Sequence, residues 1–153
     1  MRKVLFLLCF LCYGKIVIGQ ASYPYRDIKL EKPADYKATE KMALSAATFL
    51  LNTPFVDVDT DRGSALKFLN DWMTGNKEYQ FYFKGKALSI AEDLSLFSLF
   101  LAAMAKYSLE NKLEAVNPLN VDKNAAQIVL AYCDDPKNNF KLKKKYRKIL
   151  EQN

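Results

Sequence analysis

The sequence of 153 residues contains no histidine, and it has only three cysteines and five glycines. Without histidine, the Ser-His and Cys-His pairs of nucleophilic catalysis and histidine-bound metal sites are excluded. None of the glycines stands in the spacing of a phosphate-binding loop or a dinucleotide fingerprint. We therefore expect a non-enzymatic protein with no catalytic residues, no metal site and no cofactor.

The first 21 residues have the order of a secretory signal peptide. Arg2 and Lys3 form a positive head, residues 4–13 are an unbroken apolar run, and small residues follow at Gly19 and Ala21. A run of ten apolar residues is too short to cross a hydrocarbon core that needs about 20. We expect cleavage after Gly19 or after Ala21, and a protein that is exported to the periplasm or secreted.

Removal of this segment would take away two cysteines and leave only Cys133. A lone thiol cannot form an internal disulfide, so the fold is expected to depend on packing alone. Asp134 and Asp135 follow the cysteine at a predicted helix end, where negative charge raises a thiol pKa. We therefore interpret Cys133 as a buried, inert thiol rather than a reactive one.

The rest of the chain predicts one all-α domain. Residues 22–32 read as an extended lead-in, and residues 33–153 as a single compact helical bundle. Half of the residues are apolar, which is enough for a core. Apolar residues recur at the spacing of amphipathic helices over about five segments. These segments are residues 33–51, 61–74, 89–111, 121–133 and 139–151.

The third segment, residues 89–111, is expected to be the central helix. Between residues 94 and 105 only two serines interrupt the apolar residues. Ser89 and Glu92 have the spacing of a capping box at its start, and Gly75 stands where a left-handed cap would end the second helix. Residues 77–86 carry alternating aromatic side chains, and we expect an ordered connection there because no second strand is evident.

Positive charge is concentrated in the last helix. Residues 137–153 contain seven basic residues and one acidic residue, whereas residues 22–136 contain 13 basic and 16 acidic residues. This pattern predicts a surface for an acidic envelope protein or an anionic membrane, while export makes nucleic acid an unsuitable partner. The alternative is a solvated helix face whose cations suit the helix C-terminus. The candidate residues are Lys141, Lys143, Lys144, Lys145, Arg147 and Lys148.

Six aromatic residues lie close together in the sequence between positions 55 and 83. They could line an apolar pocket for a small ligand near Trp72. The alternative is that they close the core over the connecting segment, because aromatic residues normally supply core area. The candidate residues are Phe55, Trp72, Tyr79, Phe81, Tyr82 and Phe83.

Asp57, Asp59 and Asp61 alternate in one loop, as the first ligands of a calcium loop do. The sixth position of such a loop should be glycine but is Arg62, and the twelfth should be glutamate but is Phe68. The favoured interpretation is that these acids stabilise the start of the second helix, with Asp59 or Thr60 as its cap.

The motifs Trp72-Met73-Thr74-Gly75, Leu109-Glu110-Asn111-Lys112 and Ala131-Tyr132-Cys133 resemble those of small exported helical proteins of Bacteroidota-type bacteria. The resemblance runs through most of residues 34–150. It implies a periplasmic or secreted location and a shared fold, and it implies no activity.

The sequence as a whole favours an envelope binding or accessory module that holds a partner on a helical surface. The alternative is a carrier of a small apolar or aromatic ligand in a pocket near Trp72.

Overall fold

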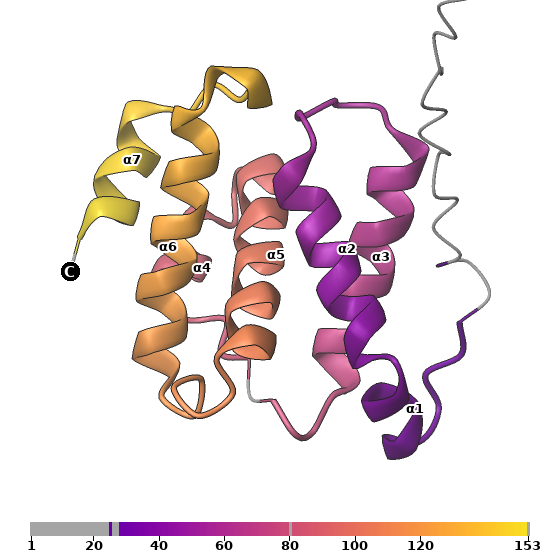
Figure 1. The fold of residues 1–153 in the computed structure, drawn as a ribbon. Coiled ribbons are helices and arrows are strands. Elements are labelled where there is room, and N and C mark those ends of the chain that lie inside the picture. Colours follow the sequence, from indigo (N-terminus) through magenta and orange to yellow (C-terminus); the bar gives the residue numbers. More distant parts are fainter. Residues whose placement is uncertain (1–24, 26–27, 80, 153) are drawn as a thin grey trace, which may run out of the picture.

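The computed structural model describes residues 25, 28–79 and 81–152 (Figure 1). As predicted, this part of the chain is all-α: it contains seven α-helices, one 3₁₀ helix and no strand. The predicted signal peptide lies outside the described residues. The helices are α1 (Pro33–Ala38), α2 (Glu40–Asn52), α3 (Thr60–Gly75), α4 (Lys86–Ile90), α5 (Leu94–Glu110), α6 (Pro118–Asp134), η1 (Pro136–Asn138) and α7 (Lys144–Glu151).

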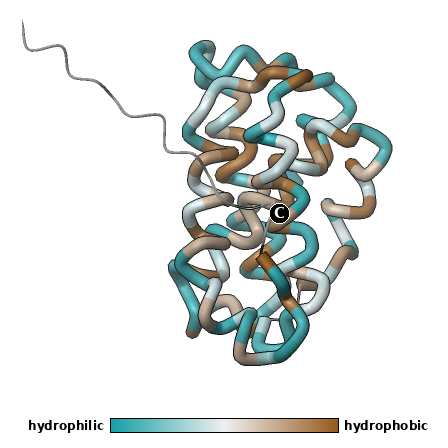
Figure 2. Tube along the Cα trace, turned by 90° about the vertical axis from the view of Figure 1, so that its right-hand side faces the viewer, coloured by the Kyte–Doolittle hydropathy of each residue, from teal (hydrophilic) through white to brown (hydrophobic). Residues whose placement is uncertain are grey.

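The apolar helix α5 is central, as predicted. It packs against α2, α3, α4 and α6, and 11 of its 17 residues are buried. Figure 1 shows α5 between the α2–α3 pair and α6, with α7 on the outer side of α6. Ala102, Ala103 and Ala105 are fully buried, and such small side chains allow neighbouring helices to approach closely. In Figure 2 hydrophilic residues lie on the turns at both ends of the bundle and also alternate with hydrophobic residues along the helices.

The first predicted helix is two helices, because the chain breaks at Thr39. This residue has φ −99° and ψ 6°, outside helical geometry. Its hydroxyl donates to the backbone oxygens of Asp35 at 2.7 Å and Tyr36 at 3.2 Å. A threonine hydroxyl that bonds the preceding turn offers the backbone an alternative to continuing the helix.

The predicted capping box at Ser89 and Glu92 is wrong. Ser89 lies inside α4, where its hydroxyl donates to the Gly85 backbone oxygen at 2.9 Å. The cap of α5 is Asp93, whose carboxylate accepts from the Leu96 N–H at 3.2 Å. Aspartate is as good a cap as serine, so α5 begins at Leu94 rather than at residue 89.

The predicted left-handed cap at Gly75 is also wrong. Gly75 is the last residue of α3, and the cap Asn76 has an extended conformation with φ −73°. The glycine is needed for a different reason, because a Cβ at this position would lie 2.0 Å from Tyr36 Oη. Tyr36 holds its place by donating from Oη to the Leu30 oxygen at 3.0 Å.

The last two helices differ from the prediction at their starts. Helix α6 begins three residues earlier than predicted, because Asn117 caps it through the Leu119 N–H and Pro118 suits the first helical turn. Helix α7 begins five residues later, at Lys144. Before it lies Asn139, which has the left-handed conformation with φ 52°, and helices do not continue through such a residue.

Candidate functional site

Helix α7 is attached to the bundle by one apolar face. Tyr146 and Leu150, four residues apart, are each only 3% exposed, and the helix contacts α6 and α4. The Lys145 ammonium lies 4.4 Å from the centre of the Tyr146 ring. Lys144 and Lys148 lie on the side of the helix opposite this buried face, because two residues along an α-helix correspond to roughly 200° of rotation.

Three of the six predicted basic residues turn toward the body of the protein. The Lys143 ammonium donates to Asp93 at 2.8 Å and the Lys145 ammonium to Glu92 at 3.4 Å. Arg147 forms an ion pair with Asp134 at the end of α6. The basic helix is therefore partly neutralised by acids from the start of α5 and the end of α6.

The pKa values of these groups follow from the pairing. Burial acts to raise the pKa of Asp93, but the hydrogen bonds from the Lys143 ammonium and the Leu96 N–H outweigh it, so the pKa is lowered. The Asp93 carboxylate raises the pKa of Lys143 in turn. The Arg147 guanidinium lowers the pKa of Asp134. Both ion pairs therefore stay charged at neutral pH.

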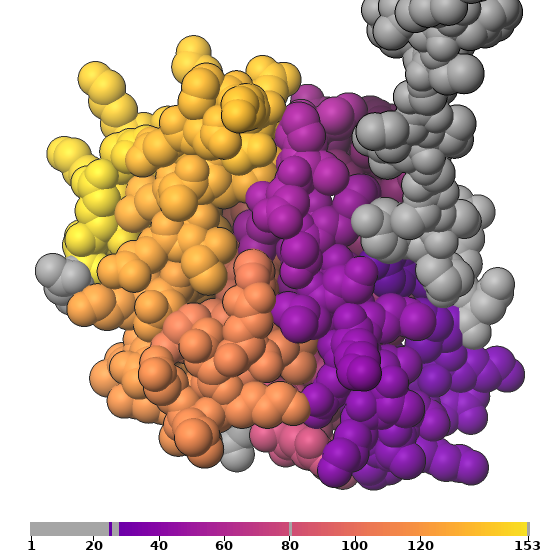
Figure 3. All heavy atoms as spheres, in the orientation of Figure 1, coloured from indigo at the N-terminus to yellow at the C-terminus, as the bar shows by residue number. Residues whose placement is uncertain are grey.

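The other three predicted basic residues point outward. Lys141, Lys144 and Lys148 are exposed, and in residues 28–79 and 81–152 no acidic group forms an ion pair with any of them. We call these three residues the outer lysines. Figure 3 shows long side chains of the yellow C-terminal segment projecting from one edge of the molecule.

Three of the six predicted aromatic residues meet, and they meet in the core. The centroid of the Trp72 ring lies 5.6 Å from that of Tyr79 and 6.1 Å from that of Phe81. Trp72 is 0% exposed, and its Nε1–H donates to the Tyr36 backbone oxygen at 2.9 Å. The indole is therefore a core side chain closed by the connection that follows α3.

The remaining three aromatic residues lie elsewhere. Phe55 packs edge-on against Phe140 with a centroid distance of 5.0 Å. Phe83 lies 6.3 Å from Phe97 and is 40% exposed, and Tyr82 is 42% exposed. Closeness in the sequence therefore does not bring these six rings into one pocket.

Tyr79 is the member of the aromatic set that lies beside a group of charges. Its hydroxyl donates to Glu40 at 3.3 Å, and the Lys112 ammonium donates to the other oxygen of Glu40 at 2.6 Å. Burial raises the pKa of Tyr79, and the Glu40 carboxylate raises the pKa of Lys112. A hollow of about 420 Å³ lies beside them, lined in part by Ala115 and Val116.

The aspartate-rich loop caps a helix, in agreement with the favoured interpretation. Asp59 accepts from the Asp61 N–H at 2.8 Å and the Arg62 N–H at 3.0 Å, which makes it the N-cap of α3. Over the described part of the chain, no group of three or more cysteine, aspartate or glutamate side chains could hold a metal ion.

Cys133 is half-buried near the end of α6. Burial raises the pKa of its thiol to about 12, and the Asp134 carboxylate adds to this shift. The direction agrees with the prediction, but burial is a larger cause than the aspartate, and the side chain is half-buried rather than buried as predicted. A thiol with this pKa contains very little of the reactive thiolate at neutral pH.

The sequence interpretation missed Arg62, a buried cation at 6% exposure. Its guanidinium donates to the backbone oxygens of Leu50 at 3.0 Å and Thr53 at 3.3 Å and to the Thr53 hydroxyl at 2.6 Å. It therefore satisfies the Leu50 carbonyl at the end of α2 and shares the Thr53 carbonyl with the Tyr132 hydroxyl. A signal was present, because Arg62 stands three residues before the buried Ala65 and shares the inner face of α3.

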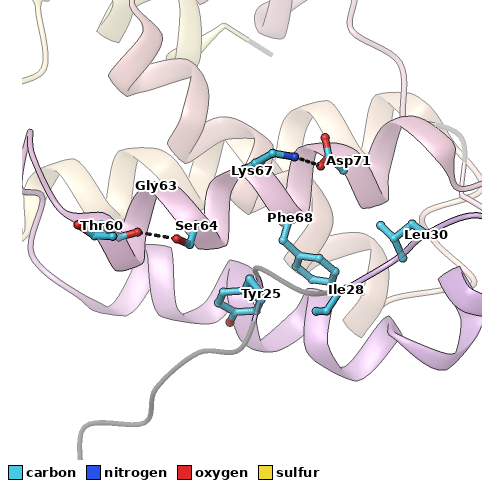
Figure 4. A pocket seen from close by; sticks show the side chains of 9 residues that line it. All are labelled: Tyr25, Ile28, Leu30, Thr60, Gly63, Ser64, Lys67, Phe68 and Asp71. Atoms are coloured by element: carbon cyan, nitrogen blue, oxygen red, sulfur yellow. Dashed lines mark hydrogen bonds and ion pairs between the residues drawn. The ribbon is translucent and has the colours of Figure 1, made fainter.

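The sequence also gave no sign of a hollow between the lead-in and α3, which we call the strap hollow (Figure 4). Its volume is about 450 Å³. Tyr25 stacks on Phe68 of α3 with a centroid distance of 5.2 Å and an angle of 17° between the rings. Ile28 and Leu30 continue the apolar wall. In Figure 4, Lys67 and Asp71 lie along the edge of α3 that is opposite to Phe68 and Tyr25.

Comparison with protein-family models, with curated proteins and with solved structures finds no match to this chain. None of the helices in the described part of the chain combines the length and the apolar character that a membrane span requires.

Proposed function

We propose that this chain is an exported, non-enzymatic binding module that holds an acidic protein partner on its outer lysines. The observation that carries the proposal is the division of the basic residues into two sets. Lys143, Lys145 and Arg147 pair with the body, while the outer lysines face away from it.

The inward set fixes the position of the outward set. Tyr146 and Leu150 pack α7 onto the bundle, and the ion pair of Lys143 with Asp93 ties the start of the helix to the start of α5. A cationic surface that is already ordered loses little conformational entropy when a partner binds. Complementary charge also accelerates association and selects against basic partners.

An acidic protein suits this surface better than an anionic membrane does. A helix that enters a lipid surface needs an apolar face that is free to be buried there. In α7 the apolar residues Tyr146 and Leu150 are already buried against the bundle, and each is only 3% exposed. Ile149, beside Lys148, also packs against the core and is partly buried, so α7 keeps little free apolar surface next to the outer lysines.

The test is chemical cross-linking of the tagged protein in its native envelope, followed by mass spectrometry. In one variant the three outer lysines are changed to glutamate. In the matched control the exposed lysines Lys37, Lys41 and Lys77 are changed in the same way, which gives the same net charge. These lysines belong to α1, to α2 and to the connection after α3, and Figure 1 shows α1, α2 and α3 on the other side of α5 from α7.

The proposal expects one abundant acidic protein to be captured by the wild type and by the control, and lost from the outer-lysine variant. Equal capture by all three forms would contradict the assigned surface. A different result would assign the surface to a membrane: no form captures a protein, and anionic vesicles retain the wild type but not the outer-lysine variant.

A further inference from the structure

The strap hollow has one apolar wall that comes from two distant parts of the chain. Tyr25, Ile28 and Leu30 precede the first helix, and Phe68 belongs to α3. Tyr25 is 5% exposed and Phe68 is 4% exposed, so the stacked rings form a solid base rather than a loose flap. The volume of about 450 Å³ falls within the range of small-molecule sites, roughly 300–1,000 Å³.

The opposite wall is polar but carries no net charge. Thr60, Ser64, Lys67 and Asp71 recur at helical spacing along one side of α3. The Lys67 ammonium and the Asp71 carboxylate pair with each other at 2.5 Å, so they neutralise one another at the mouth of the hollow. A charged ligand would gain little from this wall.

The hydrogen-bonding groups of this wall are complementary to a hydroxyl group. Ser64 donates its single hydroxyl hydrogen to the Thr60 oxygen at 2.8 Å, so toward the hollow it can only accept. The Lys67 ammonium has three hydrogens and uses one on Asp71, so it can still donate. A ligand hydroxyl both donates and accepts, so it is complementary to either residue.

Gly63 is a second and independent feature of the same wall. It lies in the first turns of α3, where glycine is among the least favourable residues. Packing does not require it, because a Cβ at this position would meet no atom within 4 Å. Its backbone φ is not in the left-handed region. The missing side chain leaves open space beside the helix backbone on this wall of the hollow.

We propose that the strap hollow is a binding site for a small neutral amphiphile with an apolar body and a hydroxyl-bearing end. The apolar body lies against Tyr25, Phe68 and Ile28, and the hydroxyl lies between Ser64 and Lys67. The site does not involve α7, so it stands or fails separately from the acidic-partner proposal.

The probe for this site is 2-naphthol, which is neutral at pH 7 and combines an aromatic body with one hydroxyl. Its affinity is measured by fluorescence titration and compared with that of naphthalene and of 2-naphthoate. Nuclear Overhauser contacts between the bound probe and the protein locate the site. Two variants, Gly63→Leu and Ser64→Leu, place a side chain in the hollow. Gly63 also borders the smaller neighbouring hollow at Phe55 and Ser64 does not, so an effect of both variants points to the strap hollow. The control is Asn70→Leu, an exposed position on the same helix.

The proposal expects 2-naphthol to bind and to show contacts with the rings of Tyr25 and Phe68. Both filling variants should weaken binding at least about tenfold, with melting temperatures no lower than that of the wild type, whereas the control should bind like the wild type. The carboxylate and the unsubstituted hydrocarbon should bind more weakly than the alcohol. Absence of binding up to millimolar probe, equal affinity for 2-naphthoate, contacts confined to other residues, or equal binding by the filling variants would each overturn it.

Discussion

The Lys143 ammonium lies 2.8 Å from Oδ2 of Asp93, and this ion pair joins the C-terminal helix to the start of the central helix. The other oxygen of the same carboxylate, Oδ1, accepts from the Leu96 N–H and caps α5. One side chain therefore has two separate functions, and different substitutions should remove them one at a time.

We expect Asp93→Asn to keep the cap and lose the ion pair, and Asp93→Ala to lose both. An asparagine caps a helix about as well as an aspartate does, so the first change removes only the ion pair. Because Lys143 is largely exposed, this loss should lower the unfolding free energy by less than about 1 kcal/mol. The alanine variant should cost about 1–2 kcal/mol. Urea unfolding measures both values, and Asp71→Asn, at the exposed pair with Lys67, is the control with almost no effect. Equal losses for the two Asp93 variants would show that the cap has no separate role.

The attachment of α7 should weaken in acid. The pKa values of Asp93 and Asp134 lie below their ordinary value of 3.8 in the folded protein. A carboxyl of this kind contributes stability above its unfolded pKa and loses it as the pH falls through the folded pKa. The contribution should therefore be complete above about pH 5 and decline below about pH 4. The partner lysines have raised pKa values, so their contribution to stability is complete below pH 10.5 and is lost only as the pH rises past their folded pKa values.

Amide hydrogen exchange followed from pH 6 to pH 3, corrected for intrinsic rates, measures this weakening. The amides of α7 should lose protection before those of α2, whose ends are not held by these ion pairs. Simultaneous loss of protection in both helices would mean that the ion pairs do not hold α7 separately.

The helical class and roughly five main helices could be predicted from the sequence, because apolar periodicity reports which faces are buried. The boundaries failed where two local signals compete. At Ser89 and Asp93 two acceptable caps lie four residues apart; Asp93 caps α5, and Ser89 lies inside the short helix α4 that packs against it. At Thr39 the hydroxyl bonds to the preceding turn break a pattern that is otherwise continuous.

The candidate sites were less accessible to sequence reasoning, because they depend on contacts between distant segments. Lys143 and Lys144 are adjacent in sequence, yet Lys143 finds Asp93 fifty residues away and Lys144 does not. The strap hollow needs Tyr25 to lie on Phe68. Neither relationship follows from local spacing.

Arg62→Met should destabilise the protein by about 3 kcal/mol. The guanidinium is nine-tenths buried and supplies the hydrogen bonds of the Leu50 and Thr53 oxygens at the end of α2. Removing it leaves the Leu50 carbonyl without its side-chain donor, whereas the Thr53 carbonyl keeps the Tyr132 hydroxyl. Hydrogen bonds to charged groups each contribute about 1.5–3 kcal/mol. Lys67→Met, an exposed position on the same helix, should change stability by less than about 0.5 kcal/mol. Similar values for the two variants in urea unfolding would contradict the capping role of Arg62.

A glycine-to-alanine change should have opposite effects on stability at the two glycines of α3, because their surroundings differ. Gly63→Ala should stabilise the protein by about 0.5–1 kcal/mol, because the new methyl group meets no atom and alanine favours the helix. Gly75→Ala should destabilise it by about 1–3 kcal/mol, because the new methyl group collides with Tyr36.

Thermal unfolding of both glycine variants gives the sign directly. A double variant that combines Gly75→Ala with Tyr36→Ala should show a smaller loss than the sum of the two single changes. Additive losses would mean that the two residues do not collide.

The most direct test of the central proposal is lysine footprinting of the unaltered protein. An amine-reactive reagent is applied to the protein in its native envelope and to the purified protein, and labelling is quantified at each lysine. Lys141, Lys144 and Lys148 should be protected in the envelope and labelled when the protein is purified, while Lys37, Lys41 and Lys77 should be labelled equally in both samples. Equal labelling of the outer lysines in the two samples would contradict the proposal that they hold a partner.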